Sequence, residues 1–455
     1  MATDLRRAAP RLHYVCSACG AEAPKWEGRC PACEAWNSLS EDVLSLARRV
    51  PAALATAATT TALGAVMAVP ARVLPTGSSE LDRVLGGGIV PGSVVLLGGD
   101  PGIGKSTIAL QMSHSCGDEV SPALYCTGEE SLEQLALRAR RLGCTGARVR
   151  LLAESDVDTV IATIEAERPS LVVVDSVQTL RDAATPGPPG SVSQVRAAVL
   201  RMSEVAKTTG VPVLLVGHVT KEGAIAGPRT LEHMVDVVLY LEGERLGEHR
   251  MLRGIKNRFG ATGEVGLLTM ERDGVRDVAA SSRGMLDAAS LGASGSVLTI
   301  TCDGLRPMAV EVQALAVASP FAFPRHTASG FELNRLHLMI AILVKRAGIA
   351  VAKLDVFVNV AGGIRLSDPG TDLGVVLAIA GSVSNRAVSR RCAVIGELGL
   401  GGEVRRVSRT EVRLAEAAAV GMEAVILPES YRGGVPGSLR CHRVATLIEA
   451  VALLG

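Results

Sequence analysis

A glycine-rich loop that begins at Gly99 is the segment of this chain best suited to chemistry. Its eight residues fit the pattern G-x-x-x-x-G-K-[ST] and stand between the apolar run 94–99 and the helix-like stretch 107–115. Glycines let backbone N–H groups converge on a phosphate, and the following helix N-terminus adds a favourable dipole. The pattern predicts a phosphate-binding loop formed by Gly99, Asp100, Pro101, Gly102, Ile103, Gly104, Lys105, Ser106 and Thr107.

Three side chains of this loop have separate expected roles. Lys105 should reach the β- and γ-phosphates, the Ser106 hydroxyl should coordinate Mg²⁺, and Thr107 should lie near the α-phosphate. The alternative is a chance glycine-rich turn, which the flanking strand and helix patterns disfavour. We therefore predict that the chain binds ATP together with Mg²⁺.

A carboxylate further along the chain suits the same site. The apolar run 171–176 carries Asp175 at its end, where a Walker-B aspartate would hold the magnesium ion through water. An aspartate in such a place often merely begins a turn. Downstream of a phosphate loop, in one sheet, the magnesium-holding role is the favoured interpretation.

Hydrolysis needs a group that positions the attacking water, and the run 123–128 ends next to two glutamates. Glu129 is the better candidate, with Glu130 as the neighbour that could replace it. The alternative is that both carboxylates simply open a helix, where the dipole favours them. His218 follows another apolar run and suits a γ-phosphate sensor, or else a hydrogen-bonded residue at a strand end.

Two C-x-x-C pairs near the N-terminus form a second chemical constellation. Ten residues separate the pairs, and four thiolates at such spacing can close a tetrahedral zinc site. A module this small would depend on the metal to fold; a redox dithiol pair is the alternative, but its usual βαβ setting is absent. Lys25, Trp26 and Arg29 lie between the pairs and could contact nucleic acid or protein, or Trp26 could pack over the knuckles. The predicted zinc ligands are Cys16, Cys19, Cys30 and Cys33.

The composition is that of a globular protein with room for two or three domains in 455 residues. The formal net charge is +1, so any nucleic-acid surface must be a local patch. The start lacks a secretory pattern, and no run of about 18 apolar residues suggests a membrane span. With cysteines that suggest a metal site rather than disulfides, these features predict a cytoplasmic location.

Apolar runs define the elements that must position these residues. Runs of this length, separated by longer segments, are typical of parallel strands buried on both faces of an α/β sheet. Residues 284–455 contain strand-like and Ala-rich helical segments of their own. The runs assigned to the first sheet are 94–99, 123–128, 171–176, 211–218 and 236–243.

The order of these blocks, with the opening LPTGSSELDRVLGGGIVPGSVVLLGGDPGIGKST and the segment KNRFG at 256–260, resembles the RadA (Sms) family of bacterial DNA-repair proteins over nearly the whole chain. The resemblance implies an α/β protein with a RecA-like P-loop ATPase core, a small N-terminal zinc ribbon and a C-terminal Lon-protease-like α/β domain. The corresponding ranges are a zinc ribbon at 11–38, an Ala/Thr-rich linker at 39–70, the ATPase domain at 71–283 and the Lon-like domain at 284–455.

The KNRFG segment is the most specific element of this resemblance. Lys256 and Arg258 stand two residues apart, so an extended backbone presents both cations to one side. In a RecA- or DnaB-like ring such cations reach the ATP of the neighbouring subunit and stabilise charge in the transition state. A solvated basic turn is the alternative.

The family resemblance further implies a hexameric, DNA-stimulated ATPase that moves along single-stranded DNA and promotes branch migration of recombination intermediates. Its partners would be single-stranded and branched DNA and a RecA-type recombinase. A candidate DNA-contacting loop is the segment 220–230, with Lys221 and Arg229. Because aromatic residues make up only 2% of the chain, phosphate contacts would outweigh base stacking.

The last block is similar to the Lon protease domain, whose peptidase activity requires a Ser–Lys dyad. Aligned on the flanking glycines, Asp372 falls at the serine position and Arg413 at the lysine position. Lys353 is the last lysine, so no lysine after it can activate a nucleophile. We predict an inactive scaffold used for ring assembly. A basic face for DNA contact, or merely a solvated charge run, would comprise Arg365, Arg386, Arg390 and Arg391.

Two other functions fit parts of the pattern. An ATP-dependent protease would use the last block for cleavage, and the missing lysine counts against it. A KaiC-like regulatory switch would bind ATP and partners without moving DNA, and the KNRFG segment disfavours it.

Overall fold

A computed structural model describes residues 13–16, 21–34, 36, 38–42, 60, 73–217, 231–243, 249–278 and 291–455. The chain divides into two compact units. Within the described residues, no helix has the length and apolarity needed to cross a membrane. The first unit comprises Met1–Glu242, Leu252–Thr262 and Met270–Val275, and the second comprises Gly243–Met251, Gly263–Thr269 and Arg276–Gly455.

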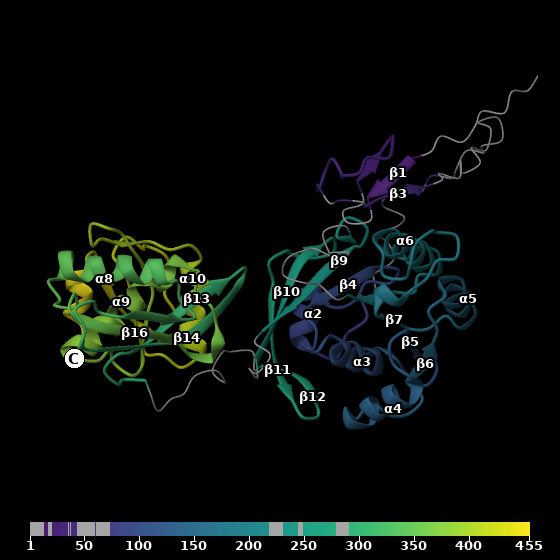
Figure 1. Cartoon of the computed structure of the whole chain (residues 1–455). Helices are drawn as coiled ribbons and strands as arrows, with labels where there is room; N and C mark the ends of the chain where they lie inside the picture. The colour runs from purple at the N-terminus through teal and green to yellow at the C-terminus, as the bar shows by residue number, and fades with distance from the viewer. Residues whose placement is uncertain are drawn as a thin grey trace, which may run out of the picture. The chain divides into compact units, whose positions relative to one another are not determined.

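The N-terminal module is a small antiparallel sheet (Figure 1). Its core holds two of the cysteines, Cys16 and Cys30, together with Ala23 and Leu39. So few apolar side chains bury little surface, which fits the expectation that a metal stabilises the module. The sheet has the order β2-β1-β3, with β1 at His13–Cys16, β2 at Glu22–Ala23 and β3 at Leu39–Asp42.

The phosphate loop belongs to a sheet of nine strands in the order β12-β11-β10-β9-β4-β8-β7-β5-β6. The six strands from β9 to β6 are parallel, and all five apolar runs of the sequence lie among them, as predicted. The sequence analysis did not predict β6, because the side chains of this strand are only partly buried and do not form a continuous apolar run. The strands are β4 Val94–Gly99, β5 Ala123–Thr127, β6 Val149–Ala153, β7 Val172–Asp175, β8 Val213–Val216, β9 Val237–Glu242, β10 His249–Asn257, β11 Val265–Glu271 and β12 Gly274–Asp277.

Helices of the same unit begin at side chains that satisfy free N–H groups. Ser78 caps α2, Asp156 caps α5, and Ser131 forms a capping box with Gln134 at the start of α4. The helices are α2 Ser79–Leu85, α3 Lys105–Cys116, α4 Leu132–Arg141, α5 Val157–Glu167 and α6 Val192–Thr209, with a 3₁₀ turn, η2, at Val177–Thr179.

The second unit contains a mixed sheet of seven strands in the order β15-β16-β14-β13-β17-β20-β21 (Figure 1). Strands β13, β14 and β16 pair antiparallel, and the remaining pairs are parallel. The strands are β13 Ser296–Asp303, β14 Arg306–Ala318, β15 His326–Ser329, β16 Leu354–Val360, β17 Cys392–Val394, β20 Ala424–Pro428 and β21 Arg440–Val444, and a separate pair is β18 Glu397–Leu398 with β19 Val404–Arg405.

The core of the second unit is centred on α9, which is apolar on all sides. Its ten residues from Asp372 to Gly381 are buried, as expected of a helix enclosed by other elements. The predicted fold class is thus confirmed in both units. The helices here are α8 Leu333–Ala347, α9 Asp372–Ser384, α10 Thr410–Ala419 and α11 Leu447–Val451, with 3₁₀ turns η4 Ala361–Gly363 and η5 Pro369–Thr371.

Candidate nucleotide-binding site

The predicted phosphate loop joins the end of β4 to the start of α3. Gly104 occupies the N-cap of α3 with φ of 116°, and Lys105 is the first helical residue. At Gly99, φ is 152°, and a Cβ there would lie 2.6 Å from the carbonyl oxygen of Leu241. Only glycine fits such a place without displacing the backbone of β9.

Lys105 is turned into the loop rather than toward solvent, with 4% of its surface exposed. Its Nζ donates hydrogen bonds to the carbonyl oxygens of Gly99 at 2.8 Å and Asp100 at 2.9 Å. Burial lowers the pKa of Lys105, and the nearby carboxylates of Asp175, Asp100 and Glu129 oppose this shift. The loop therefore holds a cation at its centre, where phosphate oxygens would be further acceptors.

Asp175 reaches the same edge of the sheet from two strands away. Strand β8 lies between β4 and β7, and Val216 pairs with Leu97 on one side and with Asp175 on the other. Parallel strands direct their carboxyl ends to one edge, so Asp175 and the loop after Gly99 share that edge. The predicted pairing of a phosphate loop with an acidic strand end is present in the structure.

Tyr125 fixes the orientation of this aspartate. Its hydroxyl donates a 2.6 Å hydrogen bond to Oδ2 of Asp175, and burial together with the charge of Asp175 raises the pKa of Tyr125 well above its ordinary value. Tyr125 is completely buried in β5. The sequence analysis did not single out Tyr125. The available signal was a tyrosine within an apolar run, because a buried phenol hydroxyl needs a hydrogen-bond acceptor.

The two glutamates after β5 differ in their surroundings. Glu130 forms an ion pair with Arg138 of α4, and its N–H donates to Thr127 Oγ1. Glu129 instead accepts a 2.5 Å hydrogen bond from Ser176 Oγ, next to Asp175. Glu129 therefore lies with the nucleotide-site carboxylate, and its role in positioning water stays a prediction.

The proposed sensor His218 and the loop 220–230 lie outside the described residues. The last described residue before them is Gly217, whose N–H donates to the Leu97 carbonyl oxygen at 3.0 Å. The chain thus leaves β8 directly beside β4.

Lys256 and Arg258 lie at the opposite edge of the sheet from the phosphate loop. Arg258 Nη1 is 3.0 Å from Asp236 Oδ1, and Asp236 Oδ2 accepts a 3.0 Å hydrogen bond from the N–H of Val94, the first residue of β4. Lys256 Nζ donates to the carbonyl oxygens of Glu232 at 2.5 Å and Val235 at 2.8 Å. Burial, followed by the charge of Arg258, lowers the pKa of Lys256.

Three of the four predicted zinc ligands converge. The Sγ atoms of Cys16, Cys30 and Cys33 lie within 4.8 Å of one another, while Cys19 is outside the described residues. Cys16 Sγ is 3.2 Å from Ser38 Oγ, and Cys30 Sγ accepts a 3.4 Å hydrogen bond from the N–H of Ala32. This arrangement of thiols and N–H donors fits zinc, which binds sulfur ligands tetrahedrally.

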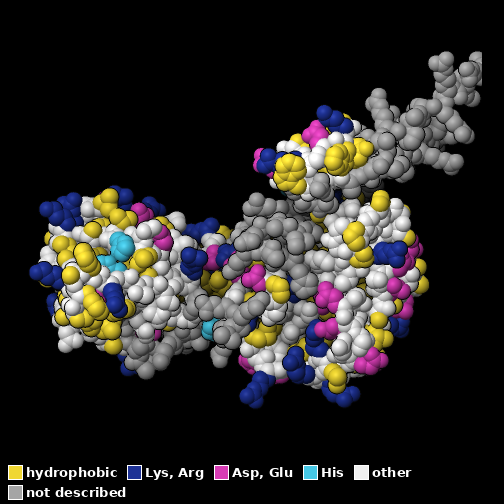
Figure 2. Space-filling view, viewed as in Figure 1, with side chains coloured by type: hydrophobic (Ala, Val, Ile, Leu, Met, Phe, Trp, Pro, Cys, Tyr) yellow, Lys and Arg dark blue, Asp and Glu magenta, His cyan; other side chains and the backbone are white. Residues whose placement is uncertain are grey.

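The residues between the cysteine pairs are on the surface of the module. Trp26 is 55% exposed and lies outside the small core. Lys25 pairs with Glu27, and Arg29 pairs with Glu34. Hydrophobic, basic and acidic side chains are interspersed on the face of the module seen in Figure 2.

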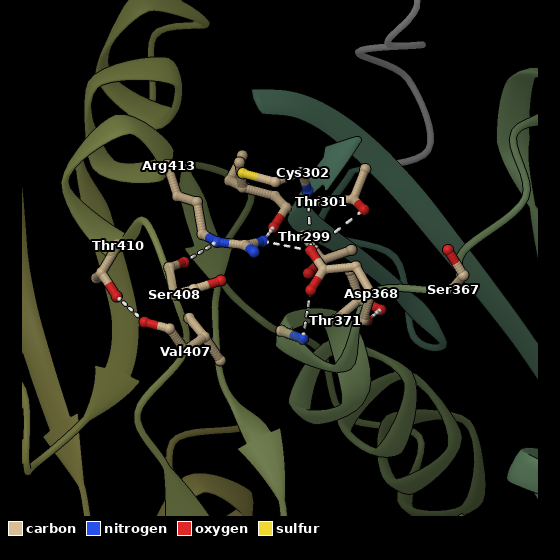
Figure 3. A network of polar contacts seen from close by, with 12 residues as sticks. Thr299, Thr301, Cys302, Ser367, Asp368, Thr371, Val407, Ser408, Thr410 and Arg413 are labelled. Carbon is tan, nitrogen blue, oxygen red and sulfur yellow. Dashed lines mark hydrogen bonds and ion pairs between the residues drawn. The ribbon is translucent and has the colours of Figure 1, made fainter. Parts of the chain in front are cut away.

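In the second unit, the residues at the predicted dyad positions belong to two separate ion pairs. Arg413 is buried, and its Nη1 donates to Asp368 Oδ2 and to the Ile300 carbonyl oxygen, both at 2.6 Å (Figure 3). Burial alone would raise the pKa of Asp368, but Arg413 and backbone N–H donors bring it below its ordinary value. Asp372 pairs with Arg335 at 2.5 Å.

The loop, the Walker-B strand end and the intervening strand together define a RecA-like P-loop core. Three family models match the chain: "AAA domain" at residues 59–224, "Rubredoxin metal binding domain" at 14–41 and "Subunit ChlI of Mg-chelatase" at 336–431. A solved structure of the RadB recombinase matches 45% of this chain and 100% of its own, with 25% identity and a TM-score of 0.37.

Curated relatives match nearly end to end. DNA repair protein RadA of Halalkalibacterium halodurans is 44% identical over 97% of this chain and 98% of its own length, and that of Bacillus subtilis is 43% identical over 96% and 97%. The RadA protein of Pseudomonas aeruginosa is 46% identical over 91% of this chain and 92% of its own. The chain belongs to the RadA family of DNA repair proteins.

Replacing Tyr125 with Phe tests the orientation of the aspartate. Loss of a buried hydrogen bond to a charged acceptor should lower the free energy of unfolding by roughly 1.5–3 kcal/mol, and the Mg²⁺ concentration for half-maximal ATP turnover should rise. The matched control is Tyr431→Phe, which removes a hydroxyl from the second unit. An unchanged Mg²⁺ requirement in the Tyr125 variant would contradict the assigned role.

The buried acid Asp372 predicts a pH dependence in the second unit. Burial raises the pKa of Asp372 to about 6, against the opposing charge of Arg335, whereas an aspartate in an unfolded chain titrates near ~3.9. The folded state therefore binds the proton more tightly. The stabilisation it gives is complete below pH ~4 and is lost as the pH rises through about 6.

Hydrogen exchange of α9, corrected for intrinsic rates, measures this loss. The free energy of opening should fall by roughly 2–3 kcal/mol between pH 4 and 7, and Asp372→Asn should flatten the profile. Asp355→Asn is the control, because hydrogen bonding lowers the pKa of that carboxyl. A profile that is already flat in the unsubstituted chain would refute the assignment.

Proposed function

We propose that this chain is a DNA-dependent ATPase that moves along single-stranded DNA and processes recombination intermediates during repair. Membership of the RadA family supports the assignment to DNA repair. The geometry of the phosphate loop, with a buried lysine and a Walker-B carboxylate at one sheet edge, supports ATP hydrolysis. The remaining features bear on how hydrolysis would be coupled to movement.

The residues at the sheet edge fit ATP and Mg²⁺. Backbone N–H groups from Gly99 to Gly104 and the start of α3 would hold the phosphates, and Lys105 would neutralise their charge. Ser106 and Asp175 would hold Mg²⁺, which supplies further charge neutralisation when bound. Glu129, steadied by the hydroxyl of Ser176, would orient the attacking water.

The location of Lys256 and Arg258 is the observation that carries the motor function. Arg258 is tied through Asp236 to Val94, and five residue steps separate Val94 from Gly99. At ~3.3 Å per residue this is about 16 Å, further than either side chain extends. These cations therefore cannot serve the phosphate loop of their own chain, and we infer that they serve that of a neighbour in a ring, for which six subunits is the expected number.

The same contacts suggest a path from hydrolysis to DNA. Lys256 holds the carbonyl oxygens of Glu232 and Val235, which directly follow the candidate DNA loop at 220–230 in the sequence. If Lys256 turns toward a neighbour's phosphate, it releases those two carbonyls. Arg258 and Asp236 connect the same place to the start of β4, so a change at the subunit interface would reach both the loop and the nucleotide strand.

The second unit would then be a scaffold without peptidase activity. Asp372 and Arg413 are each held in a buried ion pair, and neither is placed as a nucleophile with its base. Ring assembly, with single-stranded and branched DNA and a RecA-type recombinase as partners, completes the proposal. Intact casein after prolonged incubation with the ATP-bound protein is the expected result, and fragments would support the protease instead.

Mixing two inactive variants tests the action across subunits. Lys105→Ala and Lys256→Ala should each abolish turnover stimulated by single-stranded DNA. In mixed rings, an interface that combines Lys105 of one chain with Lys256 of its neighbour is intact, so roughly a quarter of the stimulated rate should return by random assortment.

Leu200→Ala, which alters an exposed side chain of α6, is the matched control and should behave as the unsubstituted chain. No recovery in rings shown to be mixed would contradict the action of Lys256 across the subunit interface. Turnover indifferent to DNA would leave an ATP-gated switch.

The cysteine cluster predicts one zinc ion per chain. Cys30→Ser should lose the zinc and unfold the N-terminal module, because its apolar core is too small to be stable without the metal. Metal analysis and tryptophan fluorescence report both changes, since the only two tryptophans are Trp26 and Trp36. Cys126→Ser, at a lone buried thiol of β5, should keep the zinc. Equal zinc content in both variants would refute the site.

A further inference from the structure

The hairpin of β11 and β12 contacts the phosphate loop from the side opposite the Walker-B aspartate. The methyl group of Met270 lies against Gly104 so closely that a Cβ at Gly104 would overlap Met270 Cε. Met270 itself is only partly buried. The apolar, partly buried side chain of Met270 thus adjoins the start of α3.

The hairpin is fixed to α3 by a two-way hydrogen bond. Gln111 Nε2 donates to the Val275 carbonyl oxygen at 3.1 Å, and Gln111 Oε1 accepts from the Val275 N–H at 2.9 Å. Gln111 is about one turn along the helix from Thr107. The amide therefore holds Met270 at a set position relative to the loop.

The order of strands determines which end of a nucleotide lies here. Asp175 ends β7 and Glu129 follows β5, and both strands lie on the β8 side of β4, whereas β9, β10 and β11 lie on the other side. A triphosphate whose γ-phosphate faces those carboxylates extends its nucleoside away from them. That direction leads past the first turn of α3 to the hairpin.

We propose that Met270 is the surface on which the nucleobase of the bound nucleotide stacks, with Gln111 as the residue that positions it. This inference rests on the proposed nucleotide binding. A thioether packs favourably against an aromatic ring and does not distinguish bases by their hydrogen-bond donors and acceptors. Met270 therefore adds affinity for a base without selecting among bases.

Calorimetric titration of the full chain with Mg-ATP and with Mg-tripolyphosphate separates the base from the phosphates. Met270→Ala should raise the dissociation constant for ATP about three- to tenfold, the effect of one sulfur–aromatic contact. Tripolyphosphate should bind within about twofold of the unsubstituted chain, which also shows that the loop is folded. The ATP dissociation constant of Met270→Leu should fall between those of the unsubstituted chain and of Met270→Ala. Leu200→Ala is the matched surface control.

The outcomes distinguish this inference from the proposed function. Unchanged ATP affinity in Met270→Ala, or equal weakening of ATP and tripolyphosphate, overturns the role of Met270 and leaves the nucleotide site intact. If the unsubstituted chain binds neither ligand, the proposed ATPase itself fails. A selective loss of ATP affinity supports the stacking surface.

Discussion

The strand β4 is the constraint on which the rest of the ATPase unit depends. Its last residue opens the phosphate loop, and its first residue donates to Asp236, which also pairs with Arg258. Every strand from β9 to β6 runs parallel to it, so nucleotide chemistry gathers at one edge and the KNRFG cations at the other. The length of β4 therefore separates the KNRFG cations from the phosphate loop of the same chain.

Burial governs the electrostatics at Lys105 in the first unit and at Arg413 in the second. Around Lys105 the loop carbonyls and three carboxylates compensate a cation that desolvation would otherwise disfavour. In the second unit Arg413 and Asp368 compensate one another in the same way, within a core where an unpaired charge would be costly. The residues at the two positions where a Lon-type dyad would be sought, Arg413 and Asp372, are held in separate ion pairs with Asp368 and Arg335.

The sequence predicted the features that depend on local pattern. These features are the phosphate loop, the aspartate at the end of β7 and the thiol pairs. In each of them the residue types and their local spacing indicate the chemistry. The sequence analysis preferred Glu129 to Glu130, but it did not predict the ion pair of Glu130 with Arg138, eight residues further along. Tyr125 and Met270 were missed, since their roles come from tertiary contacts with Asp175 and Gly104. Only the folded sheet places β11 beside a loop more than 160 residues earlier.

The measurement that tests the central claim most directly is a photocrosslink from position 256. A photoreactive amino acid is placed there in a mixture of ¹⁴N- and ¹⁵N-labelled chains, and the products are identified by mass spectrometry in the presence of ATP and single-stranded DNA. The account predicts crosslinks of mixed isotopic composition to the peptide containing Gly99–Ser106. Crosslinks confined to the same chain, at residues such as Glu232 and Val235, would contradict it.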